Sequence, residues 1–65
     1  MNLIEKYIRD VGISQSELAR RLGVSQPTVS DWIAGKKTPS GDKVLSLAKE
    51  MGITPERVLK QLYGE

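Results

Sequence analysis

Apolar residues recur at intervals of three and four along most of the chain, which is the spacing of one buried face of a helix. The first segment shows this spacing at Leu3 or Ile4, Tyr7, Ile8 and Val11. The β-branched residues are scattered, and no segment has the alternation that a half-buried strand requires. The pattern therefore predicts an all-α chain.

One local motif occurs four times and indicates where helices begin. It consists of an apolar residue, a Ser or Thr directly after it, and a second apolar residue four positions after the hydroxyl. The four copies are Ile13, Ser14 and Leu18; Val24, Ser25 and Val29; Pro39, Ser40 and Val44; and Ile53, Thr54 and Val58. In each copy the hydroxyl can cap the helix while the two apolar residues form a hydrophobic staple. Asn2 with Glu5, and Ser14 with Glu17, also have the spacing of capping boxes, in which each side chain satisfies a backbone N–H of the other.

Glycine and proline mark the remaining helix boundaries. Pro55 suits the first position of a helix, and a glycine follows each apolar segment, at Gly12, Gly23, Gly35, Gly52 and Gly64. These signals predict five helices, over about residues 2–11, 15–22, 26–34, 41–51 and 55–63. No linker or repeat divides them, so we expect one compact domain over residues 1–65.

The composition excludes several classes of function. The chain has 65 residues, enough for one small domain, and contains neither Cys nor His. The thiolate and imidazole ligands of zinc and the commonest general base are therefore absent. We expect no catalytic residue, no metal site, no cofactor and no small-molecule ligand. Charges in the first ten residues and the short apolar runs indicate neither an export signal nor a membrane span, so we expect a cytoplasmic protein.

The charges are unevenly distributed, although the net charge is only +2. The segment from residue 20 to residue 43 contains five bases and two acids: Arg20, Arg21, Lys36, Lys37 and Lys43 against Asp31 and Asp42. A basic centre of this kind suits a polyanionic partner, but a solvated basic surface gives the same pattern. Charge alone therefore does not decide the function.

The most specific pattern lies between Gln15 and Gly35, where the sequence is QSELARRLGVSQPTVSDWIAG. Two helices that cross closely need a small residue at the crossing, here Ala19, and a residue that tolerates positive φ at the turn, here Gly23. Apolar residues on both sides fix the crossing angle: Leu18, Leu22, Val24, Val29 and Trp32 or Ile33. This combination predicts a helix-turn-helix motif rather than a generic helical hairpin.

With this motif the chain resembles the lambda-repressor and Cro regulators of bacteria and phages, the XRE family. The match runs from Ser14 through Gly35, with one helix before it and two after it, and it is most similar to a free-standing phage Cro-type protein. The resemblance implies a five-helix DNA-binding domain that regulates transcription, as a repressor of Cro type in the bacterial cytoplasm or nucleoid. It implies a homodimer that binds double-stranded DNA at a palindromic operator, with the third helix in the major groove. The loop GKKTPSG is more basic than in some members, and Pro27 is an uncommon choice.

A recognition helix that enters the major groove by its N-terminal end places its first turns at the base edges. The candidates for base readout are Gln26, Pro27, Thr28 and Asp31. A Gln amide can bond adenine N6 and N7, and the Thr methyl or the Pro ring can pack on a thymine methyl. Asp31 has two alternative roles, because a carboxylate can accept from cytosine N4 or can exclude other sequences.

The candidates for phosphate contacts surround this helix. They are Ser14, Gln15, Ser25, Ser30, Lys36, Lys37, Thr38 and Ser40. The resemblance implies that Gln15 clamps a phosphate and braces Gln26, and that the loop after the recognition helix lies on the sugar-phosphate backbone. For Ser14 and Ser25 a purely structural capping role is the alternative. Arg20 or Arg21 can alternatively pair with Glu17 or Asp31.

Trp32 is expected in the core, together with Tyr7, Val44, Leu47, Ala48, Met51, Val58 and Leu62. Leu45 and Leu59 lie off the buried stripes, and with Pro55 and Tyr63 they are candidates for the surface that contacts a second copy. Two further interpretations stay open. One is a protein-interaction or antitoxin-like module, and the other is a DNA-binding head cut from a larger regulator.

Overall fold

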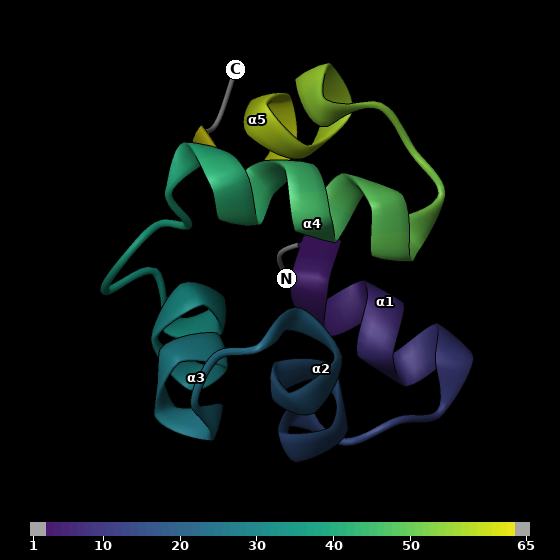
Figure 1. Ribbon diagram of the computed structural model, residues 1–65, viewed down its shortest axis with the longest axis vertical. Coiled ribbons are helices and arrows are strands. Elements are labelled where there is room, and N and C mark those ends of the chain that lie inside the picture. Colours follow the sequence, from purple (N-terminus) through teal and green to yellow (C-terminus); the bar gives the residue numbers. More distant parts are fainter. Residues whose placement is uncertain (1–2, 64–65) are drawn as a thin grey trace.

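The computed structural model describes residues 3–63 and contains five helices in this part of the chain. They are α1 (Leu3–Val11), α2 (Gln15–Leu22), α3 (Gln26–Ala34), α4 (Gly41–Met51) and α5 (Pro55–Tyr63). The all-α prediction is confirmed, and so are the predicted bounds within the described residues; the predicted start at residue 2 and the Asn2 cap lie outside them. Figure 1 shows α4 across the middle of the molecule, α5 on one side of it, and α2 and α3 on the other.

All five helices contribute to one apolar core. Its buried members are Ile4, Leu18, Ala19, Leu22, Val29, Trp32, Val44, Leu47, Ala48 and Val58. Tyr7 and Met51 are half-buried and pack against this cluster. The side chain of Leu62 lies outside the described residues. Val11 continues the apolar spacing of the first segment but is not buried: its side chain, at the last residue of α1, is 49% exposed.

Three of the predicted hydroxyl caps form. The Oγ of Ser14 accepts from the backbone N–H of Glu17 at 3.0 Å, and Ser25 and Thr54 accept from the third residue after them in the same way. The cap expected from the Ser40 hydroxyl is absent: its oxygen accepts no backbone N–H of α4, and the group donates to the Asp42 carboxylate at 2.6 Å. The backbone of Ser40 still occupies the N-cap position of α4.

The turn between α2 and α3 depends on Gly23. Its backbone adopts φ 72° and ψ 32°. This left-handed conformation is unfavourable for any residue that has a Cβ atom, and glycine has none. The N–H of Val24 then donates to the carbonyl of Ala19 at 3.0 Å, which closes the end of α2. Ala19 itself is 3% exposed, as expected for a small residue where two helices cross. This turn returns the chain so that α3 begins beside the start of α2 (Figure 1).

Four charged and polar side chains connect α1, α2 and α4. The guanidinium of Arg21 binds Glu17 at 2.9 Å and Glu50 at 2.7 Å, and the hydroxyl of Tyr7 donates to the same Glu50 oxygen at 2.8 Å. Glu17 also accepts two bonds from Arg20, so its carboxylate does not return to Ser14 as the capping box predicts. Two guanidinium groups outcompete a single backbone N–H for this carboxylate.

These contacts shift the titration of the two acids. Hydrogen bonds from Arg20 first, and then from Arg21, lower the pKa of Glu17 to about 2. The Arg21 guanidinium, followed by the Tyr7 hydroxyl, lowers the pKa of Glu50. Both acids therefore favour the folded state in their ionised form.

Substitution of Gly23 tests the turn. We expect Gly23→Ala to lower the free energy of unfolding by about 1 to 2 kcal/mol, because alanine is strained in the left-handed region although a Cβ would meet nothing within 4 Å. Urea denaturation followed by circular dichroism measures the change. Gly41→Ala is the matched control: Gly41 begins α4 without positive φ and also has open space around its Cβ position, so this variant should be as stable as the parent or more stable. Equal losses in both variants would contradict the role assigned to Gly23.

Acid stability tests the ionic contacts. A group whose pKa is lowered on folding stabilises the protein above its unfolded pKa, and this contribution is lost as the pH falls toward its folded pKa. For Glu17 the window extends from about 4.5 down to about 2. We expect the free energy of unfolding to fall across this window in the parent and to fall less in Glu17→Gln. Parallel pH profiles of the two proteins would refute this assignment.

Candidate nucleic-acid interface

The helices α2 and α3 begin at the same end of the molecule (Figure 1), and the side chains of their first residues bond to each other. The Nε2 group of Gln26 donates to the Oε1 atom of Gln15 at 3.1 Å. This is the brace that the resemblance implied. It uses one N–H of Gln26, so that the second N–H and the oxygen of this amide remain as a donor and an acceptor for a base edge. The NH₂ group of Gln15 can donate to a phosphate oxygen in the same arrangement.

The first turn of α3 presents one amide and two apolar groups. Gln26 and Pro27 are exposed, and Thr28 is half-buried. The hydroxyl of Thr28 lies 2.8 Å from the Oγ of Ser25, and the same Oγ accepts from the Thr28 N–H at 3.4 Å. Because the Thr28 hydroxyl is engaged locally, its methyl group is the part that suits an apolar contact with a thymine methyl.

Asp31 joins α3 to the basic loop that follows it. Its carbonyl accepts from the N–H of Lys36 at 2.9 Å, and its half-buried carboxylate lies 4.0 Å from the Nζ atom of Lys37. The carboxylate is thus on the side of α3 where the loop leaves it. A contact between Asp31 and a cytosine would compete with its attraction for Lys37.

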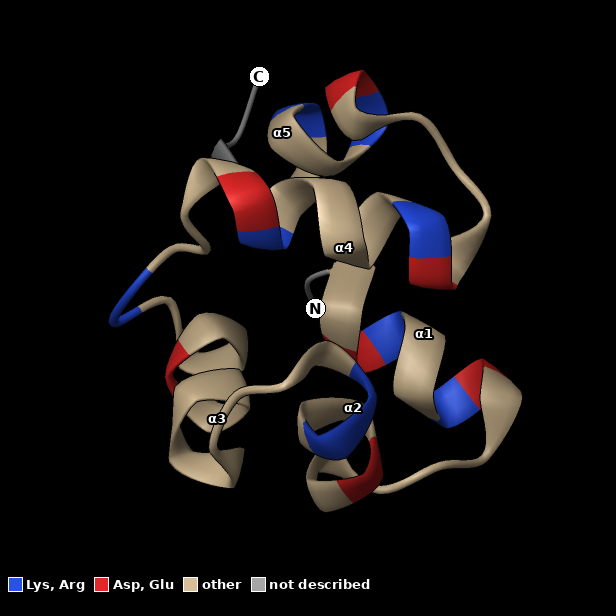
Figure 2. Cartoon of the chain, viewed as in Figure 1, with Lys and Arg blue, Asp and Glu red and all other residues tan. Residues whose placement is uncertain are grey.

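Figure 2 shows the basic residues of the middle segment divided between α2, the loop after α3 and the start of α4. Arg20 and Arg21 both bind Glu17, which confirms the pairing with Glu17 that the sequence left open. Lys43 donates to the carbonyl of Leu22 at 3.1 Å and so ties α4 to the end of α2. The sequence does not predict this contact, because a lysine on one helix gives no local sign of which carbonyl it will reach.

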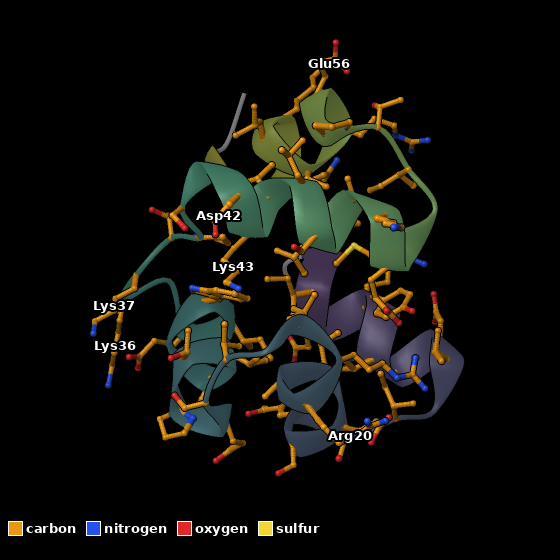
Figure 3. All side chains as sticks on the ribbon, in the orientation of Figure 1. Arg20, Lys36, Lys37, Asp42, Lys43 and Glu56 are labelled. Atoms are coloured by element: carbon orange, nitrogen blue, oxygen red, sulfur yellow. The ribbon has the colours of Figure 1, made fainter. Side chains whose placement is uncertain are left out.

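The two lysines of the loop differ from these bases. Figure 3 shows Lys36 and Lys37 extending away from the body of the protein, whereas Lys43 points from α4 toward the layer of α2 and α3. The side chain of Lys37 is 73% exposed, as is that of Arg20, but Arg20 is bound to Glu17 on its own helix. The buried Pro39 anchors the loop behind both lysines. Lys36 and Lys37 are therefore the bases of this segment best placed to meet an external anion.

Three of the hydroxyls predicted to contact phosphates are bonded within the protein. Ser14 and Ser25 serve as helix caps, and Ser40 donates to Asp42. Thr38 is exposed in the loop, and Ser30 is half-buried on α3. A capping hydroxyl still has a proton to donate, so its cap does not prevent a phosphate contact.

Residues 3–63 offer neither of two other kinds of site. No group of three or more His, Cys, Asp or Glu side chains in this range could hold a metal ion. No helix in the same range is both long enough and apolar enough to cross a membrane.

Comparison with known proteins agrees with the geometry. A family model described as helix-turn-helix matches residues 4–58, which is most of the chain. No curated protein and no solved structure matches it. The matched range includes the crossing of α2 and α3, the braced glutamines at their first residues, most of α1, all of α4 and the first turn of α5. The chain therefore belongs to the XRE-type helix-turn-helix family, the DNA-binding regulators similar to lambda repressor and Cro.

Proposed function

We propose that this DNA-binding regulator is a sequence-specific repressor of the Cro type, which binds a palindromic operator as a homodimer with α3 in the major groove. The observation that supports the proposal best is the bond between Gln15 and Gln26. It fixes a base-reading amide and a phosphate-binding amide relative to each other before DNA arrives, which reduces the entropy lost on binding.

In this proposal the N-terminal end of α3 reads the bases. Gln26 bonds an adenine through its remaining N–H and its oxygen, while Pro27 and the Thr28 methyl pack on thymine methyl groups. Asp31 either accepts from a cytosine N4 amino group or disfavours other sequences at its position. All four side chains come from the first two turns of one helix, so a single half-site is only a few base pairs long.

The phosphate contacts set the position of α3. Gln15 and the N-terminus of α2 hold one phosphate, because backbone N–H groups and the helix dipole favour an anion there. Ser14, Ser25 and Ser30 contribute hydroxyls near the two helices. The loop adds a second group of contacts through Lys36, Lys37, Thr38 and Ser40. These contacts orient the domain and make its affinity salt-dependent without distinguishing bases.

A homodimer follows from the short reach of one recognition helix. A two-fold dimer doubles the number of bases read and requires inverted half-sites about 34 to 36 Å apart. Occupation of such an operator would block polymerase, so DNA binding alone is sufficient for repression. This role requires the protein to be located where the DNA is, in the bacterial cytoplasm or nucleoid.

Selection from a random pool of double-stranded DNA tests the proposal directly. The purified chain is mixed with the pool at near-physiological salt, and the retained DNA is sequenced. Two inverted half-sites one helical turn apart are the expected result. Weak, salt-sensitive retention without an enriched sequence would reject sequence-specific operator binding and favour a protein-interaction module on the same scaffold.

The Gln26→Ala variant tests base readout. We expect it to weaken binding to the selected operator by about 1 to 3 kcal/mol and to relax one base position, while its affinity for random duplex changes little. Titration of both duplexes followed by fluorescence anisotropy gives the two affinities. Gln61→Ala is the matched control, because Gln61 is an exposed glutamine on α5, away from α2 and α3. An equal loss on both duplexes would show that Gln26 does not read a base.

The Lys37→Ala variant tests the role of the loop. We expect it to weaken binding to operator and random duplex by the same factor and to reduce the slope of log affinity against log salt by about 0.9, the value for one phosphate contact. Lys60→Ala, at an exposed position on α5, removes the same charge and should leave the slope unchanged. A change of base preference in Lys37→Ala would contradict a pure phosphate contact.

A further inference from the structure

The outer face of α4 has a regular arrangement of side chains that the proposed DNA contacts do not use. Its exposed residues are Gly41, Asp42, Leu45 and Lys49. Leu45 is 59% exposed, the highest value among the large apolar side chains that the structure describes as exposed. We call Asp42, Leu45 and Lys49 the α4 stripe, because residues three and four apart lie on one face of a helix. Along the chain it has an acid, then a leucine, then a base.

The charge pattern of the α4 stripe is complementary to that of a second copy packed antiparallel to it. With a rise of about 1.5 Å per residue, Asp42 lies about 4.5 Å before Leu45 and Lys49 about 6 Å after it. Two copies of α4 packed antiparallel about a two-fold axis through Leu45 therefore bring each Asp42 within about one residue of the other copy's Lys49 along the helix axis. The two Leu45 side chains then meet at the axis.

The other exposed leucine does not have this property. Leu59 on α5 is 43% exposed and also has an acid three residues before it, Glu56. The base that follows is Lys60, directly adjacent and about 100° further around the helix. In an antiparallel pair Glu56 would face no base, so α5 lacks the charge complementarity that α4 has.

The α4 stripe faces a direction that allows both copies of the dimer to bind the same DNA duplex. Lys43 points from α4 toward the end of α2, to which it bonds, so its direction marks the side of α4 that faces the DNA-binding layer (Figure 3). At about 100° per residue, the stripe is turned by about 100° to 160° from Lys43 around α4. It faces sideways rather than toward the DNA. A two-fold axis perpendicular to α4 can then leave both DNA-binding layers on the same side of the dimer.

We infer that the α4 stripe is the surface through which two copies of this chain contact each other on an operator. This inference rests on the proposed operator-bound dimer and assigns its interface. Each contact has Leu45 at the centre and one Asp42 to Lys49 ion pair on either side.

The contact is small. The eleven residues of α4 extend over about 16 Å and expose one leucine, less than a stable interface of at least about 1,000 Å² requires. The isolated chain is therefore a monomer at micromolar concentration. The dimer forms when adjacent half-sites raise the effective concentration of the two copies. The observable effect is cooperative binding to the palindrome.

Two single charge reversals test the interface. Asp42→Lys places two bases opposite each other in the dimer, and Lys49→Glu places two acids opposite each other. Asp42 accepts from Ser40, one of the proposed phosphate contacts, so the affinity of each variant for one isolated half-site serves as its own reference. Relative to that reference, we expect each variant to bind the full palindrome at least about tenfold more weakly than the parent does, because like charges at a contact disfavour association. The two reversals change the net charge in opposite directions, so a general electrostatic effect on DNA binding cannot produce the same loss in both. Circular dichroism verifies that each variant is folded.

An equimolar mixture of the two variants is the decisive measurement. In a mixed dimer the reversed position of one copy faces the reversed position of the other, so a base again faces an acid. The unchanged Asp42 and Lys49 also face each other, and both ion pairs form. We expect the mixture to bind the palindrome within about threefold of the parent, a recovery that damage to the fold cannot give. Leu45→Lys should also abolish cooperativity, whereas Leu59→Lys, the matched control on α5, should retain it.

The outcomes separate this inference from the proposed function. If the parent binds the palindrome cooperatively and both reversals do so equally well, the α4 interface is wrong and the operator dimer stands. If the parent binds two half-sites independently, the operator dimer is wrong and the interface falls with it. If neither reversal is rescued in the mixture, the pairing of Asp42 with Lys49 is refuted.

Discussion

The rest of this structure depends on the close crossing of α2 and α3. The bond between Gln15 and Gln26 requires that two helices separated by three residues begin at the same end of the molecule, at side-chain distance. The chain can reverse direction this sharply only because Gly23 adopts the left-handed region, and the helices approach closely because Ala19 has a small side chain. The separation of the glutamines is therefore set by the backbone of the turn. An error in the turn would separate them without any change to the glutamines themselves.

The other helices hold this pair in place and determine which charges remain available. Lys43 ties the end of α2 to α4, and Arg21 joins α2 to α4 and, through Glu50, to Tyr7 on α1. Each of these partly exposed contacts is worth little free energy alone. In the proposed complex their larger effect is on function, because they engage bases that would otherwise attract phosphate at other positions. Lys36 and Lys37, in the loop next to the end of α3, are then the bases best placed to meet phosphate.

The features that could be predicted from the sequence are those decided by neighbours in the chain. A hydroxyl followed by an apolar residue at the fourth position marks a helix start through bonds within one turn, and four of the five helices were located in this way. The crossing of α2 and α3 was also predictable, because a small residue at Ala19 and a glycine at Gly23 together meet the requirements of two closely crossing helices. The features that were missed depend on competition between partners. The Glu17 carboxylate binds two arginines instead of the Ser14 backbone, and the Ser40 hydroxyl donates to Asp42 without forming a cap bond. Only the folded arrangement shows these partners.

The candidate site could also be predicted only in part, because some of its contacts join residues that only folding brings together. The brace between Gln15 and Gln26 is present, while the partner of Lys43 and the proximity of Asp31 to Lys37 required the three-dimensional structure. No sequence pattern could give the base preference, because it depends on which atoms of each side chain stay free after folding. For Gln26 and Thr28 the internal bonds answer part of that question: the amide keeps a donor and an acceptor, and the threonine keeps its methyl group.

The Asp31 carboxylate is subject both to attraction, from Lys37, and to repulsion, from any DNA phosphate nearby. Near DNA its carboxylate is repelled by phosphates, and in the free protein Lys37 at 4.0 Å offsets part of its charge. In the proposed complex Lys37 moves to a phosphate, and Asp31 loses this partner as the negative potential around it rises. A cytosine or adenine amino group within reach would compensate the carboxylate, because these are the two donors that bases present in the major groove. In that complex the two roles considered for Asp31, accepting from a base and excluding other sequences, become one mechanism: a carboxylate left unpaired opposite a guanine or thymine edge is penalised, and this penalty makes the contact selective.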